Sequence, residues 1–128
     1  LKALQATKVP PMVNQIELHP GFNQEDTVSY CKEHGILVEA WSPLGTGKLL
    51  ANETLAAVAA RYHKSVAQIC IRWALQKGVV PLPKSVTPAR IWDNTKVFDF
   101  ELSAQDMALI SAMPYSGGSG LDPDLVDF

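Results

Sequence analysis

Residues 12–41 read MVNQIELHPGFNQEDTVSYCKEHGILVEAW, and this segment predicts a strand, a helix and a second strand in direct succession. The apolar runs Met12–Leu18 and Ile36–Trp41 are typical of strands. Between them, Asn23–His34 carries its apolar residues on one side, as an amphipathic helix does. Gly35 then suits the left-handed residue that closes many helices, and it passes the chain directly to the second strand. Because no hairpin turn intervenes, the two strands are expected to be parallel.

The same alternation continues through the rest of the chain. We predict helices at Thr54–His63, at Ser65–Lys77, at Thr87–Asn94 and from Ser103 onward, and a third strand at Val79–Leu82. The helix from Ser65 opens with a Ser-x-x-Gln capping box, and Thr87 is an expected N-cap followed by proline at the first helical position. The opening residues LKALQATK also look helical, and Pro114–Phe128 is expected to be a loop.

Alternating strands and helices favour a parallel sheet covered by helices, either doubly wound or closed into a barrel. Periodicity alone does not separate these two architectures. Three parallel strands standing alone would leave two edges and an uncovered face. A TIM barrel needs eight strand-helix units over about 250 residues, so a chain of 128 residues supplies close to half of one. The start at Leu1, inside a helix-like segment, also leads us to expect a fragment.

Composition excludes several classes of function. Eleven Lys and Arg against 13 Asp and Glu give a net charge of -2, which does not favour binding to nucleic acid. No apolar run approaches the length that spans a bilayer, and no secretory signal opens the chain, so no membrane association is expected. Cys31 and Cys70 are too far apart for a CxxC motif and are expected to be buried thiols in a reducing, cytoplasmic setting. His19, His34 and His63 lack metal-ligand spacing, and no metal is expected.

The junction after the third strand has the residues of an anion site. Lys84 and Ser85 leave the strand, Thr87 and Pro88 open a helix, and Arg90 lies in the first turn of that helix. Two cations, a hydroxyl and the backbone N–H groups of a helix start are what a phosphate needs. The alternative is that both cations are solvated surface charges. The helix dipole disfavours cations at this end, so their presence favours the anion site.

The junction after the second strand, WSPLGTGKLL at Trp41–Leu50, combines an aromatic residue with two glycines and two hydroxyls. A loop of this kind can approach a diphosphate through its backbone. Its Gly-x-Gly lacks the third glycine and the helix opening of a dinucleotide fingerprint, so taken alone it predicts a turn.

Three segments together resemble the aldo-keto reductase family: VNQIELHP at 13–20, WSPLGTGKLL at 41–50 and LPKSVTPARIWDN at 82–94. The last is similar to the family's Lys-Ser-x(4)-Arg-x(3)-Asn signature. The stretch DFELSAQDM and the ending PDLVDF resemble the branch that holds bacterial 2,5-diketo-gluconate reductases and protozoal prostaglandin F synthases. The resemblance implies an α/β fold that forms the carboxyl-terminal portion, about strands six to eight, of a TIM (β/α)8 barrel. Residues 1–128 would then be a partial NADP-dependent oxidoreductase domain.

The resemblance also implies NADPH as cofactor and assigns a role to each contact. At the nicotinamide end, Gln15 would hold the carboxamide and Trp41 would stack on the ring. The pyrophosphate would be lined by Ser42, Leu44 and Thr46. The 2′-phosphate would be bound by Lys84, Ser85 and Arg90, and the adenine would lie beside Val86 and Asn94. Two positions depart from the common pattern, Trp41 where many members have Tyr and Asp93 where many have Glu. Trp92 either shields the adenine or covers the barrel exterior.

By the same resemblance, the intact enzyme would reduce a small aldehyde or ketone to an alcohol. The family's catalytic Tyr, Lys, Asp and His lie in the amino-terminal half of the barrel, and none of their motifs occurs here. The segment alone is therefore expected to be inactive and to need the missing amino-terminal half as its partner. The alternative is a non-catalytic half-barrel that binds nucleotide or assembles with another protein.

Overall fold

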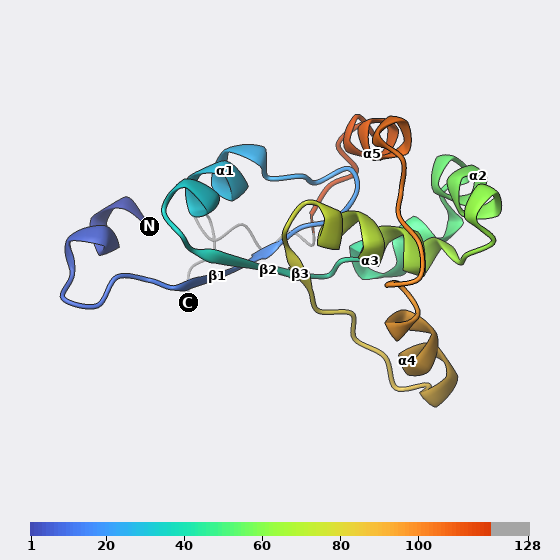
Figure 1. Cartoon of the computed structure of the whole chain (residues 1–128), viewed down its shortest axis with the longest axis horizontal. Helices are drawn as coiled ribbons and strands as arrows, with labels where there is room; N and C mark the ends of the chain where they lie inside the picture. The colour runs from blue at the N-terminus through green and yellow to red at the C-terminus, as the bar shows by residue number, and fades with distance from the viewer. Residues whose placement is uncertain (119–128) are drawn as a thin grey trace.

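The computed structural model describes residues 1–118 and shows a parallel sheet flanked by helices (Figure 1). The sheet has the order β1-β2-β3, with β1 at Val13–Glu17, β2 at Leu37–Trp41 and β3 at Val80–Pro81. The α-helices are α1 (Glu25–Glu33), α2 (Glu53–Tyr62), α3 (Val66–Gln76), α4 (Pro88–Thr95) and α5 (Ala104–Ser111), and the 3-10 helices are η1 (Lys2–Ala6) and η2 (Gly45–Ala51). The predicted order of strands and helices is confirmed.

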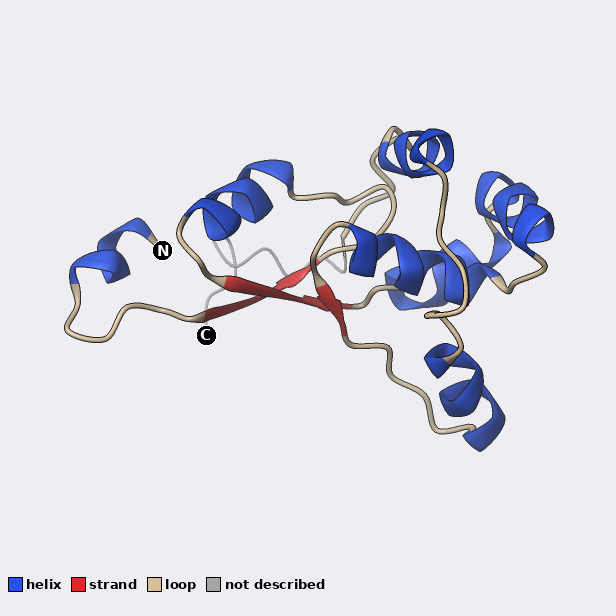
Figure 2. Ribbon diagram, viewed as in Figure 1, coloured by secondary structure: helices blue, strands red, loops and turns tan. Residues whose placement is uncertain are grey.

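Both strand pairs are parallel, as the sequence predicts (Figure 2). Val13 pairs with Leu37 and Glu17 with Trp41, so β1 and β2 end together. The third strand contributes only two residues, of which Pro81 pairs with Ala40. Because parallel strands run the same way, the loops that follow β1, β2 and β3 all leave the sheet at the carboxyl ends of the strands. We call this the carboxyl edge of the sheet.

The core lies between one face of the sheet and the helices. Val38 and Ala40 of β2 are buried on this face, and Asn14 of β1 contacts Cys31 of α1. The helix α3 contributes the buried Ile69, Cys70, Trp73 and Ala74. Burial raises the pKa of the Cys70 thiol to about 12, so this thiol stays protonated at neutral pH and is a poor nucleophile.

Local signals for helix ends are mostly confirmed. Ser65 and Gln68 form the predicted capping box of α3. Gly35 and Gly78 follow α1 and α3 with φ of 67° and 77°, the left-handed values that glycine adopts without strain. Thr87 precedes α4 as predicted, but its side chain makes no capping hydrogen bond; instead the Ser85 hydroxyl accepts from the Thr87 backbone N–H at 3.2 Å.

The chain ends differ from the sequence prediction or lie outside the structure. LKALQATK forms only the short 3-10 helix η1, none of whose residues is buried, so no packing stabilises a longer helix there. Residues 114–118 have neither helix nor strand, in agreement with the predicted loop. The remainder of that loop, including PDLVDF, lies outside the described residues.

The other face of the sheet is exposed. Val13 of β1 and its pairing partner Leu37 of β2 face this side and are 48% and 46% exposed, and Val80 of β3, which pairs with Glu39, faces the same side. Figures 1 and 2 show α1 and α3 on the opposite side. We name this surface, formed by Val13, Gln15, Leu37, Glu39 and Val80, the open face. It is the uncovered face that the sequence led us to expect from a three-stranded parallel sheet.

A carboxylate network attaches the last helix, α5, to α2. Tyr62 of α2 donates to Asp106 Oδ2 at 2.6 Å, Ser103 Oγ donates to the same oxygen at 3.0 Å, and Arg61 forms an ion pair with Oδ1. The Tyr62 hydrogen bond lowers the pKa of Asp106 below its ordinary value; desolvation opposes this effect, and Arg61 and Ser103 reinforce it. The lowered pKa makes this attachment sensitive to acid.

We expect Asp106→Asn to flatten the acid dependence of stability. A carboxyl whose pKa is lowered by folding stabilises the native state above its unfolded pKa, and this contribution disappears as the pH falls through the folded pKa. The free energy of unfolding of the wild type should therefore fall between about pH 5 and pH 3, and that of Asp106→Asn should fall less steeply. Urea unfolding at each pH measures this. Asp26→Asn, which alters an exposed carboxylate of α1, is the control, and an unchanged slope in Asp106→Asn would contradict the role of the network.

We also expect the chain on its own to self-associate, because the edges of β1 and β3 and the apolar part of the open face can pair with another copy. Leu37→Lys should shift the population toward monomer in sedimentation velocity. Leu109→Lys, at a 44% exposed leucine of α5, should not. A monodisperse wild-type monomer with cooperative unfolding would contradict this prediction.

Candidate cofactor-binding site

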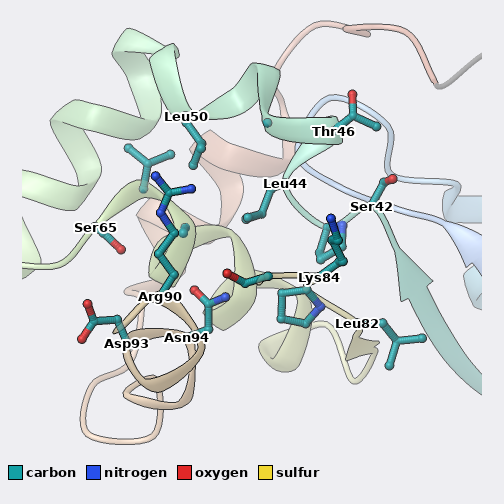
Figure 3. A pocket seen from close by; sticks show the side chains of 16 residues that line it. Ser42, Leu44, Thr46, Leu50, Ser65, Leu82, Lys84, Arg90, Asp93 and Asn94 are labelled. Atoms are coloured by element: carbon teal, nitrogen blue, oxygen red, sulfur yellow. The ribbon is translucent and has the colours of Figure 1, made fainter. Parts of the chain in front are cut away.

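A cavity of about 730 Å3 lies where β2 and β3 deliver the chain into their loops (Figure 3). Residues 42–47 after β2 form one wall and residues 82–85 after β3 form another. The first residues of α3 and one side of α4 complete the lining. Ligands of open and closed parallel α/β folds bind at this edge of the sheet, so the cavity is the principal candidate site among the described residues.

Seven of the ten predicted cofactor contacts line this one cavity: Ser42, Leu44, Thr46, Lys84, Ser85, Arg90 and Asn94. They come from segments up to 52 residues apart in sequence. Arg90, Asp93 and Asn94 fall at i, i+3 and i+4 of α4, which places them on one side of that helix.

The other three predicted contacts lie elsewhere. Gln15 is on the open face, where its Nε2 donates to Glu39 Oε2 at 2.9 Å. Trp41 ends β2 and, by strand alternation, faces the same side as Glu39. Val86 lies between the lining residues Ser85 and Arg90 in sequence, and it is 81% exposed. Since neighbouring strand residues point to opposite sides, Gln15 and Trp41 share a face with each other and not with the core.

The charges of the cavity favour an anionic ligand. Figure 3 shows Lys84 and Arg90 on either side of Asn94, with the Arg90 side chain reaching toward Leu50 and Lys84 lying on the side of Ser42. The amino-terminal end of α3 borders the same space through Ser65, Val66 and Ala67, and helix starts present backbone N–H groups and positive dipole ends. Asp93, the only carboxylate among the described residues of the lining, is paired with Lys96 at 3.0 Å. The positive charges of Lys84 and Arg90 therefore outweigh the negative charge of Asp93 in this lining.

The loop after β2 has a strained backbone. Ser42 and Thr46 have φ of 49° and 54°, left-handed values that are costly for residues with a Cβ. Gly45 and Gly47 are also left-handed, and a Cβ on Gly45 would lie 3.0 Å from Leu49 Cγ. Where the sequence predicts a simple turn, the chain forms the kinked 3-10 helix η2. Strained backbone of this kind gathers at binding sites, where surrounding structure maintains it.

Sequence reasoning missed part of the lining. Leu50, Val66 and Ala67 contribute apolar surface, and Ser65 contributes the start of α3. The capping box at Ser65 was the available signal, since it marks a helix start near the carboxyl edge of the sheet. Trp92 does not line the cavity; it is 66% exposed, with Lys96 Nζ 5.7 Å from its ring centroid.

Two negative findings hold for residues 1–118. No helix there combines the length and the hydrophobicity needed to cross a membrane. In the same residues, no three His, Cys, Asp or Glu side chains gather as metal ligands do.

Comparisons with known proteins agree on one family. A family model described as "Aldo/keto reductase family" matches residues 1–113. The chain is 49% identical over 121 residues to glyoxal reductase of Bacillus subtilis, covering 94% of this chain and 44% of that protein. It is 43% identical over 123 residues to 9,11-endoperoxide prostaglandin H2 reductase of Trypanosoma cruzi, again covering 94% and 44%.

Solved structures are similar as well. A mutant of Gox0644 crystallised with NADPH superposes with a TM-score of 0.92 at 42% identity, covering 99% of this chain and 47% of that one. An aldo/keto reductase from Brucella melitensis gives a TM-score of 0.80 at 45% identity, covering 86% and 42%. The chain thus spans about half the length of the curated relatives it matches. With residues 1–113 matched by the family model and relatives above 40% identity, this chain belongs to the aldo/keto reductase family of oxidoreductases.

Proposed function

We propose that residues 1–128 are a partial NADP-dependent oxidoreductase domain and form the carboxyl-terminal portion, about strands six to eight, of a TIM (β/α)8 barrel. Two observations support this proposal. The chain matches less than half the length of its relatives, and its parallel sheet has an open face and two edges. In a closed barrel the open face would lie inside, and the edges of β1 and β3 would pair with further strands.

The segment supplies the site for NADPH. Lys84, Ser85 and Arg90 bind the 2′-phosphate, and Ser42, Leu44 and Thr46 line the pyrophosphate. The observation that carries this assignment is that all six residues line one cavity, which is bordered by the start of α3. A lysine, a forked arginine and hydroxyls are the donor set that a phosphate requires, so the residues fit the cofactor. Asn94 lies beside the adenine, with Val86 at its exposed margin.

The nicotinamide end belongs to the open face. Gln15 and Trp41 lie on the sheet side that would face the barrel interior, where Gln15 holds the carboxamide and Trp41 stacks on the ring. Glu39, which now accepts from Gln15, fixes the orientation of that amide. The two ends of the cofactor would therefore contact different sides of the strand ends.

The intact enzyme reduces a small aldehyde or ketone to an alcohol in the cytoplasm. When bound, NADPH supplies the hydride for the carbonyl carbon. This chain provides affinity, orientation and the preference for NADP over NAD, while the catalytic Tyr, Lys, Asp and His come from the amino-terminal half. The segment alone is inactive. One of the relatives is named a glyoxal reductase, and glyoxal is a small carbonyl compound. This relative supports small carbonyl compounds as the substrate class.

A second candidate is a non-catalytic half-barrel that binds nucleotide or assembles with a partner. One observation favours it: the described residues that line the cavity, including the proposed phosphate contacts, all lie between Ser42 and Asn94 of this chain.

We expect Arg90→Ala to weaken NADPH binding by about tenfold to a hundredfold and to leave NADH binding within about twofold, because a charge-assisted hydrogen bond contributes about 1.5–3 kcal/mol and only NADPH carries the 2′-phosphate. Calorimetric titration of both cofactors measures the effect. Lys32→Ala, at an exposed cation of α1, is the control. Equal losses for both cofactors would reject the 2′-phosphate assignment.

We also expect activity only after the other half is restored. Co-expression with the amino-terminal half of the Bacillus subtilis glyoxal reductase should give NADPH oxidation with glyoxal, followed by absorbance. The chain alone should bind NADPH without turnover. Turnover by the chain alone would contradict its proposed inactivity, and an assembled complex that binds NADPH without turnover would favour the non-catalytic half-barrel.

A further inference from the structure

We propose that Gln68 of α3 is a positioning residue for the cavity, because it fixes the end of α4 and thereby the placement of Arg90 and Asn94. Gln68 does not line the cavity. The inference rests on the proposed function in one respect, that the ligand held by α4 is the 2′-phosphoadenosine end of NADPH.

The side-chain amide of Gln68 is fully engaged. Its Nε2 donates to the backbone oxygens of Asp93 at 3.0 Å and Lys96 at 3.3 Å. Its Oε1 accepts from Ser65 N at 2.9 Å and from Ser65 Oγ at 3.2 Å. An amide group has two donor hydrogens and two acceptor lone pairs, so each is used. Gln68 is 8% exposed, and solvent has little access to replace these contacts.

The helix α4 has few other means of fixing its position. It contains eight residues, and none of them is buried. The Thr87 side chain does not cap its start. The Asp93 oxygen also accepts from Lys96 N at 3.1 Å and the Lys96 oxygen from Lys64 Nζ at 3.5 Å, and Gln68 adds a buried side-chain donor to both carbonyls at this end. The attachment therefore stabilises a helix that is too short and too exposed to be held by its own packing.

The attachment lies about one helical turn from Arg90 and directly beside Asn94 in the sequence. Asp93 receives the Gln68 hydrogen bond through its backbone oxygen, while Arg90 precedes it by three residues and Asn94 follows it by one. At the other end of the same amide, Gln68 closes the capping box whose residue Ser65 also lines the cavity. One buried side chain thus joins the two helices that border the site, and its loss should move the cation of α4 relative to the start of α3.

The helix α3 offers a matched control in Gln76. Its Nε2 donates to Leu102 O at 3.0 Å, and its Oε1 accepts from Leu102 N at 2.7 Å and from Arg72 Nε at 3.0 Å. Gln76 is thus a second glutamine on the same helix that attaches a distant segment through both ends of its amide. That segment contributes no residue to the cavity.

The experiment compares Gln68→Met with Gln76→Met in the full chain, since methionine preserves the length of the side chain and removes its hydrogen bonds. Adenosine 2′-monophosphate and adenosine are the calorimetric probes. We expect Gln68→Met to weaken binding of the phosphorylated probe by about tenfold and of adenosine by less than about threefold. Gln76→Met should lower the melting temperature comparably and leave both affinities within about twofold of the wild type.

A third variant separates the two contacts of Gln68. Gln68→Glu keeps an acceptor for Ser65 and presents carboxylate oxygen to the carbonyl oxygens of Asp93 and Lys96, which repel it. It should weaken binding of adenosine 2′-monophosphate as much as Gln68→Met does while preserving the cap of α3. Amide hydrogen exchange over 91–95 reports the position of α4 without any ligand, and it should accelerate about tenfold in both Gln68 variants and not in Gln76→Met.

Unchanged exchange over 91–95 in Gln68→Met, or equal effects of the Gln68 and Gln76 variants on the phosphorylated probe, would overturn the inference. A wild-type chain that does not prefer adenosine 2′-monophosphate to adenosine would instead overturn the proposed 2′-phosphate site. In that case the exchange measurement still decides whether Gln68 positions α4, because it does not depend on the ligand.

Discussion

Parallel pairing of the three strands is the constraint on which the site depends. Because β1, β2 and β3 run in the same direction, each delivers its following loop to the same edge of the sheet. The pairing of Ala40 with Pro81 places the chain after β2 beside the chain after β3. The strained loop at 42–47 and the basic segment at 84–90 therefore border one cavity although they are distant in sequence. An antiparallel third strand would send the two cations to the opposite edge.

The helix α3 links the core to this edge. Its apolar side, with Trp73 and Ile69 fully buried, packs in the hydrophobic core. Its polar side chains reach outward to segments that follow it in the chain: Gln68 to the end of α4, Arg72 to Val97 O at 3.1 Å and Gln76 to Leu102. The chain beyond β3 is thus fixed in large part by hydrogen bonds from one helix and by the Asp106 network on α2. The position of α4, and with it the cation Arg90, follows from contacts made outside the cavity.

The open face is the other feature that characterises this sheet. One side of the sheet is buried under helices, while Val13, Leu37 and Val80 on the other side are exposed, as is Gln15, which donates to the half-buried Glu39. A sheet with one covered face suits a strand-helix unit of a larger closed fold better than an independent domain, since parallel sheets are ordinarily buried on both sides. The relatives' greater length agrees with this arrangement. It also separates the proposed nucleotide-phosphate contacts, which line the cavity, from the proposed nicotinamide contacts, which lie on the open face.

The sequence by itself determined the order and type of the strands and α-helices and the parallel sense of the strands. It also determined the capping box at Ser65 and the placement of Lys84 and Arg90 near a helix start. These features were predictable because periodicity and capping depend on neighbouring residues. Only the tertiary structure decided the rest. The contacts of Gln68 with the end of α4 and of Asp106 with α2 join residues 25 or more positions apart, and no local pattern specifies them. The left-handed backbone at Ser42 and Thr46 and the short 3-10 form of η1 likewise follow from packing, or from its absence, and local propensity does not predict them. The outward position of Trp92 was equally undetermined, since a short helix with no buried residue can present either side until another element fixes its rotation.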